Sequence, residues 1–204
     1  MKSLPLVLWI ALLLLPAAGC EKEPKRLDDY FVEFATVKKE AAGYRFQLDN
    51  GRLLIPRETD YTGNEGQRVI LNYIPWQGDT VKINYISDIF TGVVQSDGFP
   101  GKYVNDPVKI QSVWVGGDYL NMIIEVEYHS KPHKVALFRD LSSPTVDLWF
   151  SHSREDDPPG YPQMMYASFL LSSLRTQNGV SIPFRVFIRT YEGQREMQFI
   201  LHEN

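Results

Sequence analysis

Cysteine is almost absent from this 204-residue chain, which carries Cys20 alone. A disulfide within the chain and a metal site built from several cysteines are therefore excluded. A strong charge of one sign is also lacking, because 21 basic and 25 acidic residues give a net charge of −4. This balance argues against a protein that binds phosphate backbones through its charge, so we expect no nucleic-acid partner. No motif in the chain calls for a cofactor.

Long apolar runs are confined to the first twenty residues. Lys2 precedes an uncharged, leucine-rich segment that ends in Ala17, Ala18 and Gly19, directly before Cys20. A basic start, an apolar centre and small residues at the end are typical of a secretory signal. Small residues before a cysteine resemble the bacterial lipobox, in which the thiol is diacylated. We predict a signal peptide at 1–19 and lipidation of Cys20; a signal peptide cut elsewhere is the alternative.

The residues after Cys20 indicate where the protein is anchored. Residues 20–29 are mostly charged and contain one proline, which predicts a solvated tether. Acyl chains on Cys20 would hold the protein on a membrane without a spanning helix. Because Glu21 rather than Asp follows the cysteine, we predict a lipid anchor in the outer membrane, on its periplasmic or its surface face.

From Tyr30 onward, apolar residues recur with a period of two. In Tyr119–Tyr128, the even-numbered residues from Leu120 are apolar, whereas Asn121, Glu125 and Glu127 share the opposite face. This alternation predicts a strand with one buried and one solvated face. No window of a dozen residues has a helical period, so the fold class is all-β. The other predicted strands are 30–38, 44–48, 52–55, 68–74, 80–86, 108–115, 134–139, 145–151, 167–174, 183–191 and 196–201.

A break in this pattern divides the chain. Residues Gly92–Pro107 contain three glycines and two prolines and show little periodicity, so we predict a linker at 92–107. The five strands before it, in 30–91, suit a small OB-like β-barrel. The strands after it, in 108–204, suit a β-sandwich. A single unbroken sandwich is the alternative.

The strand motifs also resemble a known family. FVEFATVKK, YRFQLDNGRLLIP and QRVILNYI are followed by NDPVKIQSVWVGGDYLNMIIEVEY, all behind a lipoprotein signal. The chain is similar to the NigD-like lipoproteins of Bacteroidetes, and Asn105–Ile124 is the most specific stretch. The resemblance implies an N-terminal OB-type domain, a C-terminal β-sandwich and a hint of bacteriocin immunity, but no catalytic residue.

Histidines are the first candidates for chemistry. His129 and His133 have the spacing of a zinc-binding helix, but Pro132 and the flanking strands place them in a turn. We therefore expect a polar hairpin loop and no metal. His152 continues the alternation of Leu148 and Phe150, which predicts that it caps a core face.

Acidic residues are the second candidates. Glu155, Asp156 and Asp157 could ligate calcium, but no alternating acidic loop is present, so a solvated charge run is expected. No Gly-x-Ser-x-Gly elbow is present either. A paired-carboxylate hydrolase stays open because many acidic pairs are possible.

Aromatic residues in loops are candidates for recognition. Trp76, Phe99, Tyr103 and Tyr161 lie at strand ends or in loops rich in proline and glycine, where they could stack on sugars or contact proteins. The alternative is local packing over the end of the sandwich.

These observations predict a lipid-anchored envelope protein with a non-catalytic binding role and an unknown envelope protein or glycan as ligand. The alternative is a bacteriocin-immunity or inhibitor-type lipoprotein. A hydrolase is the third hypothesis, but we expect no enzymatic activity.

Overall fold

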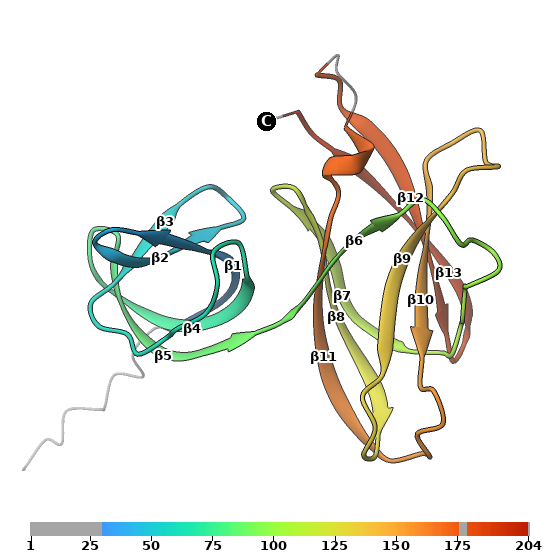
Figure 1. Ribbon diagram of the computed structural model, residues 1–204, viewed down its shortest axis with the longest axis horizontal. Coiled ribbons are helices and arrows are strands. Elements are labelled where there is room, and N and C mark those ends of the chain that lie inside the picture. The colour runs from blue at the N-terminus through green and yellow to red at the C-terminus, as the bar shows by residue number, and fades with distance from the viewer. Residues whose placement is uncertain (1–29, 176–178, 204) are drawn as a thin grey trace, which may run out of the picture.

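The computed structural model describes residues 30–175 and 179–203, which fold into strands and one short 3-10 helix, Ser172–Leu174. Figure 1 shows a small barrel beside a larger two-layered sheet. The predicted all-β class, a barrel followed by a β-sandwich, is confirmed. Within the described residues, no helix is long and apolar enough to cross a membrane.

The barrel contains strands β1 to β5 in the order β1-β2-β3-β5-β4, and pairing of β1 with β4 closes it. Alternation places Val37, Phe46, Leu54 and Leu71 inside, where they are fully buried. A turn at Asn50 and Gly51 joins β2 to β3, and Gly51 has the positive φ of 84° that glycine tolerates. The strands are β1 (Phe31–Glu40), β2 (Gly43–Leu48), β3 (Leu53–Pro56), β4 (Arg68–Gln77) and β5 (Thr80–Asp88).

The second domain is one eight-stranded sheet of order β13-β12-β10-β9-β6-β11-β8-β7, which folds over to form the two layers in Figure 1. β6 lies where the sheet folds over, because it pairs in parallel with both β9 and β11. β7 and β13 are the two edges. The strands are β6 (Phe90–Gln95), β7 (Lys109–Gly116), β8 (Tyr119–Tyr128), β9 (Lys134–Asp140), β10 (Asp147–Ser153), β11 (Tyr161–Leu170), β12 (Ile182–Thr190) and β13 (Gly193–Leu201).

The predicted linker at 92–107 begins too early, because residues 92–95 belong to β6. Gly92 interrupts the apolar alternation and so hides the strand in the sequence. The glycine is required by packing, since a Cβ at this position would lie 2.9 Å from ring atoms of Phe90 and Phe169. The sandwich therefore starts directly after the barrel's last strand.

A polar cluster joins the two domains. Arg68 of the barrel is fully buried; its Nη2 lies 2.8 Å from Asp49 Oδ1 and donates to Asn121 Oδ1 of the sandwich at 3.0 Å. Ser168 also donates to Asn121, at 2.6 Å. Asn121 was expected on a solvated face, but the barrel covers that face and buries the side chain.

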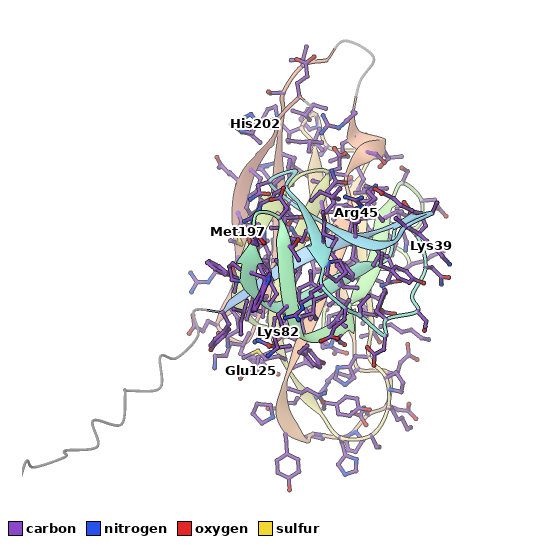
Figure 2. All side chains as sticks on the ribbon, turned by 90° about the vertical axis from the view of Figure 1, so that its left-hand side faces the viewer. Lys39, Arg45, Lys82, Glu125, Met197 and His202 are labelled. Carbon is purple, nitrogen blue, oxygen red and sulfur yellow. The ribbon has the colours of Figure 1, made fainter. Side chains whose placement is uncertain are left out.

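Apolar side chains surround the polar cluster. Phe34, Ile70 and Ile89 are buried between the domains, and Trp114 and Tyr166 of the sandwich pack against them. Figure 2, which views the molecule from the barrel side, shows the sandwich extending above and below the barrel. The two domains thus share a desolvated contact with its own apolar core.

Candidate functional site

Two loops meet at one end of the sandwich, at the bottom of Figure 1. Residues 129–133 connect β8 to β9, and residues 154–160 connect β10 to β11. We call these two loops, together with the adjoining Tyr161, the tip. The tip contains the histidine pair and the acidic run that the sequence singled out.

Asp157 ties the two loops together. Its Oδ2 accepts the backbone N–H of His129 at 2.8 Å, and its Oδ1 accepts those of Ser130 and Lys131 at 3.0 Å each. Burial raises the pKa of this carboxyl, but the three N–H donors and His133 outweigh burial and hold the pKa well below its usual range. The expectation of a solvated charge run is wrong for Asp157, because its side chain is fully enclosed.

His133 links Asp157 of the tip to His152 of the sandwich. Its Nε2 lies 3.3 Å from Asp157 Oδ2, and its Nδ1 lies 2.9 Å from Nε2 of His152. His152 is 1% exposed, as the alternation predicted, and its Nδ1 bonds the backbone carbonyl of Asp106 at 3.1 Å. Burial lowers the pKa of His152, and the nearby His133 and Arg154 lower it further.

This cluster is built to hold the tip and not to meet a substrate. The side chains of His133 and Asp157 have 0% exposure, so no substrate atom can reach them. Among the described residues, no group of three or more histidine, cysteine or acidic side chains is placed to hold a metal ion. His129 and His133, the spaced pair in the sequence, do not converge: His129 bonds Ser130 instead.

Tyr161 follows the braced loops directly and is 82% exposed. Its position is fixed by the backbone, since it pairs with Tyr128 of β8. The preceding Gly160 packs so closely that a Cβ would lie 2.0 Å from the Tyr128 carbonyl oxygen. Met164 on the same strand is also exposed, at 43%. The tip therefore presents a large aromatic side chain on a rigid backbone.

Phe99 and Tyr103, two further predicted binding residues, pack on the sandwich. The ring of Phe99 stacks on Trp149 with a centroid distance of 5.2 Å, and Trp149 stacks on Phe187 at 4.5 Å. Tyr103 contacts Trp149 edge-on at 5.7 Å. Burial raises the pKa of Tyr103. In this arrangement the two loop aromatics cover the outer face of β10 and β12.

Trp76 and Cys20 complete the predicted site residues. Trp76 is 62% exposed on the barrel, and the guanidinium of Arg57 lies 4.7 Å from its ring centroid. It is far along the chain and in a different domain from the tip. Cys20 lies outside the described residues.

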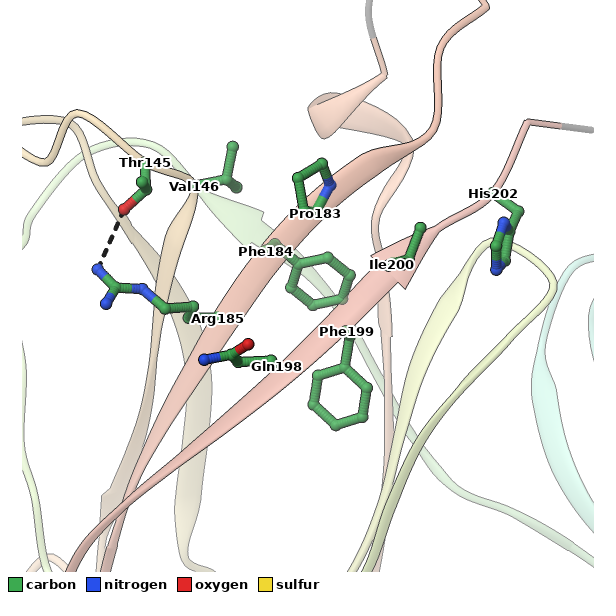
Figure 3. A pocket seen from close by; sticks show the side chains of 9 residues that line it. All are labelled: Thr145, Val146, Pro183, Phe184, Arg185, Gln198, Phe199, Ile200 and His202. Atoms are coloured by element: carbon green, nitrogen blue, oxygen red, sulfur yellow. Dashed lines mark hydrogen bonds between the residues drawn. The ribbon is translucent and has the colours of Figure 1, made fainter.

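A cavity of about 710 Å³ lies beside the C-terminal part of β13 (Figure 3). Val146, Phe184 and Phe199 give it an apolar wall. Its cation, Arg185, is already engaged, because Nε and Nη2 donate to both carboxylate oxygens of Asp147 at 2.8 and 2.6 Å. These bonds lower the pKa of Asp147. The cavity is therefore an apolar recess and not an anion site.

The tip cluster could not be predicted from the sequence. His133, His152 and Asp157 are separated by 19 and 5 residues, and no spacing rule links them. The one available signal was the strand alternation, which places the His152 side chain on the inward face. A buried histidine requires a polar partner.

The fold and these sites define a two-domain β-protein with an OB-type barrel and a sandwich. The NigD-like N-terminal OB domain matches residues 34–89, and the NigD-like C-terminal beta sandwich domain matches residues 92–201. The chain belongs to the NigD-like family, as the motifs indicated. No functionally curated protein matches it at a significant level.

Solved structures agree with this assignment. A protein described as toxin-related from Parabacteroides distasonis has 26% identity and a TM-score of 0.75 over 85% of this chain and 94% of its own. A NigD-like immunity protein from Bacteroides caccae has 25% identity and a TM-score of 0.69 over 85% and 97%. A protein of unknown function from Bacteroides vulgatus, 18% identical over 86% and 92% with a TM-score of 0.68, shares the fold.

Proposed function

We propose that this NigD-like protein is a lipid-anchored envelope protein that binds another protein through the tip and performs no catalysis. The observation that carries the proposal is the exposure of Tyr161 beside two loops that Asp157 braces. Exposed aromatic side chains on rigid backbones are the usual anchors of protein interfaces, because little conformational entropy is lost on binding.

Charged side chains around the tip suit an interface rim. Lys131 pairs with Asp156, and Lys134 pairs with Glu155 at 2.9 Å; all four side chains are at least 42% exposed. Exposed pairs of this kind contribute little to stability, but they can steer a partner and set its orientation. The tip thus combines a central aromatic anchor with a polar surround.

A pull-down from envelope extract tests the binding role. The chain from Glu21 to Asn204 retains every described residue and lacks the acylation site. Tyr161→Ala should abolish specific capture, whereas Tyr85→Ala, which removes a 59% exposed tyrosine from the barrel, should leave it unchanged. Equal capture by both variants would reject the tip as the binding surface.

The same purified protein and its variants distinguish a glycan ligand from a protein partner. Trp76 is exposed, and its ring is a candidate stacking platform for a sugar. Binding to capsule or mucin glycans that Trp76→Ala removes and Tyr161→Ala leaves intact would replace the protein partner by a glycan.

Immunity is a second candidate for the biological role, supported by the relative from Bacteroides caccae, which is described as an immunity protein. In that case the partner at the tip is a toxin. Cells that lack the gene should become sensitive to a co-encoded or sibling toxin; unchanged sensitivity would reject immunity and leave the binding role standing.

Anchoring is tested through Cys20. Labelled palmitate should enter the full-length protein and move it to the membrane fraction, and Cys20→Ser should lose both signals. A Cys20→Ser protein that stays in the outer-membrane fraction would contradict the lipid anchor.

A further inference from the structure

β13 is a long and regular edge strand. Its nine residues pair with β12 in one continuous register from Gly193 to Leu201, with no bulge and no proline. Among the described residues, β12 is the only strand that pairs with it. In Figure 2, Met197 of β13 and the adjoining His202 lie along the outer boundary of the molecule, beside the barrel. Proteins protect such edges because their free N–H and C=O groups attract a further strand.

The sequence of β13 is complementary to itself. When two copies pair antiparallel around a two-fold axis at Phe199, residues whose numbers sum to 398 lie opposite each other on the same face of the sheet. Met197 then meets Leu201, and Gln198 meets Ile200 of the second copy. Apolar and amide side chains therefore face each other around the axis.

Charge fixes the register. Continued two residues beyond the end of β13, the same alignment places Arg195 opposite Glu203 and Glu196 opposite His202 of the second copy, each twice by symmetry. An axis at Met197 would place Arg195 opposite Phe199, and an axis at Gln198 would place Glu196 opposite Ile200. A cross-strand pair of unlike charges stabilises the sheet, whereas a charge that faces an apolar residue does not. Only the axis at Phe199 pairs Arg195 with a carboxylate in this stretch.

Apolar surface beside β13 supports the same contact. The cavity of about 710 Å³ and a second one of about 450 Å³, between β13 and β7, share Phe199, Ile200 and His202. Ile200 is 49% exposed. A strand added to the edge would cover Ile200 and narrow both openings.

We propose that the protein forms a two-fold homodimer in which β13 of each copy pairs antiparallel, centred on Phe199, and joins the two sandwiches into one continuous sheet. The tips of the two protomers then lie on either side of one axis, so the dimer presents two copies of Tyr161. Isologous pairing is the commonest closed symmetry of soluble oligomers.

Sedimentation equilibrium of the chain from Glu21 to Asn204 tests the register through charge. Arg195→Glu and Glu203→Arg should each raise the dimer dissociation constant about tenfold, since each places like charges opposite each other twice. The double variant should restore the native constant. Glu192→Ala removes the intrachain partner of Arg195 and is the control that should change nothing.

Disulfide trapping gives an independent readout. Positions 196 and 202 are separated by six residues, about 20 Å of extended chain, which is too far for an intrachain bridge, but they lie opposite each other across the axis. Glu196→Cys with His202→Cys should form a covalent dimer on oxidation, and Glu196→Cys alone should not. A monomer at all concentrations, a dimer indifferent to the charge variants, or the absence of the covalent dimer would each overturn the proposal.

Discussion

The Nδ1 atom of His133 lies 2.9 Å from the Nε2 atom of His152, so one imidazole ring donates a hydrogen bond to the other. The carbonyl of Asp106 can only accept, which places a hydrogen on Nδ1 of His152 and leaves its Nε2 to accept from His133. His133 must also donate to the Asp157 carboxylate. These three contacts join the Asp157 carboxylate, both imidazole rings and the Asp106 carbonyl into one chain of hydrogen bonds.

Protonation of His152 should destabilise the protein at acidic pH. Burial lowers the pKa of His152 below its ordinary value of about 6.5, so the unfolded chain binds a proton there that the folded chain does not. The free energy of unfolding should therefore fall as pH drops below about 6.5. Denaturant unfolding at pH 7.5, 6.5 and 5.5 measures this loss. His152→Gln should flatten the dependence; an equally steep fall in that variant would contradict the assignment.

The Asp157 carboxylate should control the order of the tip. Asp157→Asn replaces a charged acceptor by an amide that offers a single oxygen, so at least one loop N–H is released. Hydrogen exchange at the amides of His129, Ser130 and Lys131 should accelerate while the barrel amides keep their protection. Asp156→Asn is the matched control, because that exposed neighbour pairs with the Lys131 side chain. Slow exchange in Asp157→Asn would show that other contacts hold the loops.

The strands could be predicted from the sequence because alternation follows directly from burial of one face. Tyr119–Tyr128 shows this, since Leu120, Met122 and Ile124 are all fully buried. Asn121 could not be placed correctly, because its burial depends on Arg68, a residue of the other domain. Gly92 hid β6 for a related reason: the ring of Phe169, from a strand far along the chain, and the ring of neighbouring Phe90 leave no room for a Cβ there.

The tip cluster escaped prediction because its members become neighbours only when the β8–β9 loop packs against the β10–β11 loop, and neither loop joins two paired strands. Asp157 lies in a run of three acidic residues that looks solvated, and nothing local separates it from Asp156. The difference is the set of loop N–H groups that face its carboxylate. Those donors come from backbone, which sequence patterns do not mark.

Removal of the buried Arg68 should strongly destabilise the junction between the domains. Burial lowers the pKa of Arg68 and raises that of Asp49, so each charge depends on the other. Arg68→Met leaves Asp49 without its partner and should cost about 3–5 kcal/mol of unfolding free energy. Adding Asp49→Leu to that variant should recover most of the loss. Equal stability of the single and double variants would show that the ion pair is not coupled.

Phe99 distinguishes packing from binding among the predicted loop aromatics. Its ring stacks on Trp149, so Phe99→Ala should cost about 2 kcal/mol of unfolding free energy through lost apolar burial. The near-ultraviolet circular dichroism of Trp149 should change as well. Tyr161→Ala is the matched control, because its ring is exposed and its loss should leave stability unchanged. If Phe99→Ala instead keeps full stability and abolishes capture of the partner, the binding surface lies on the outer face of β10 and β12 and not at the tip.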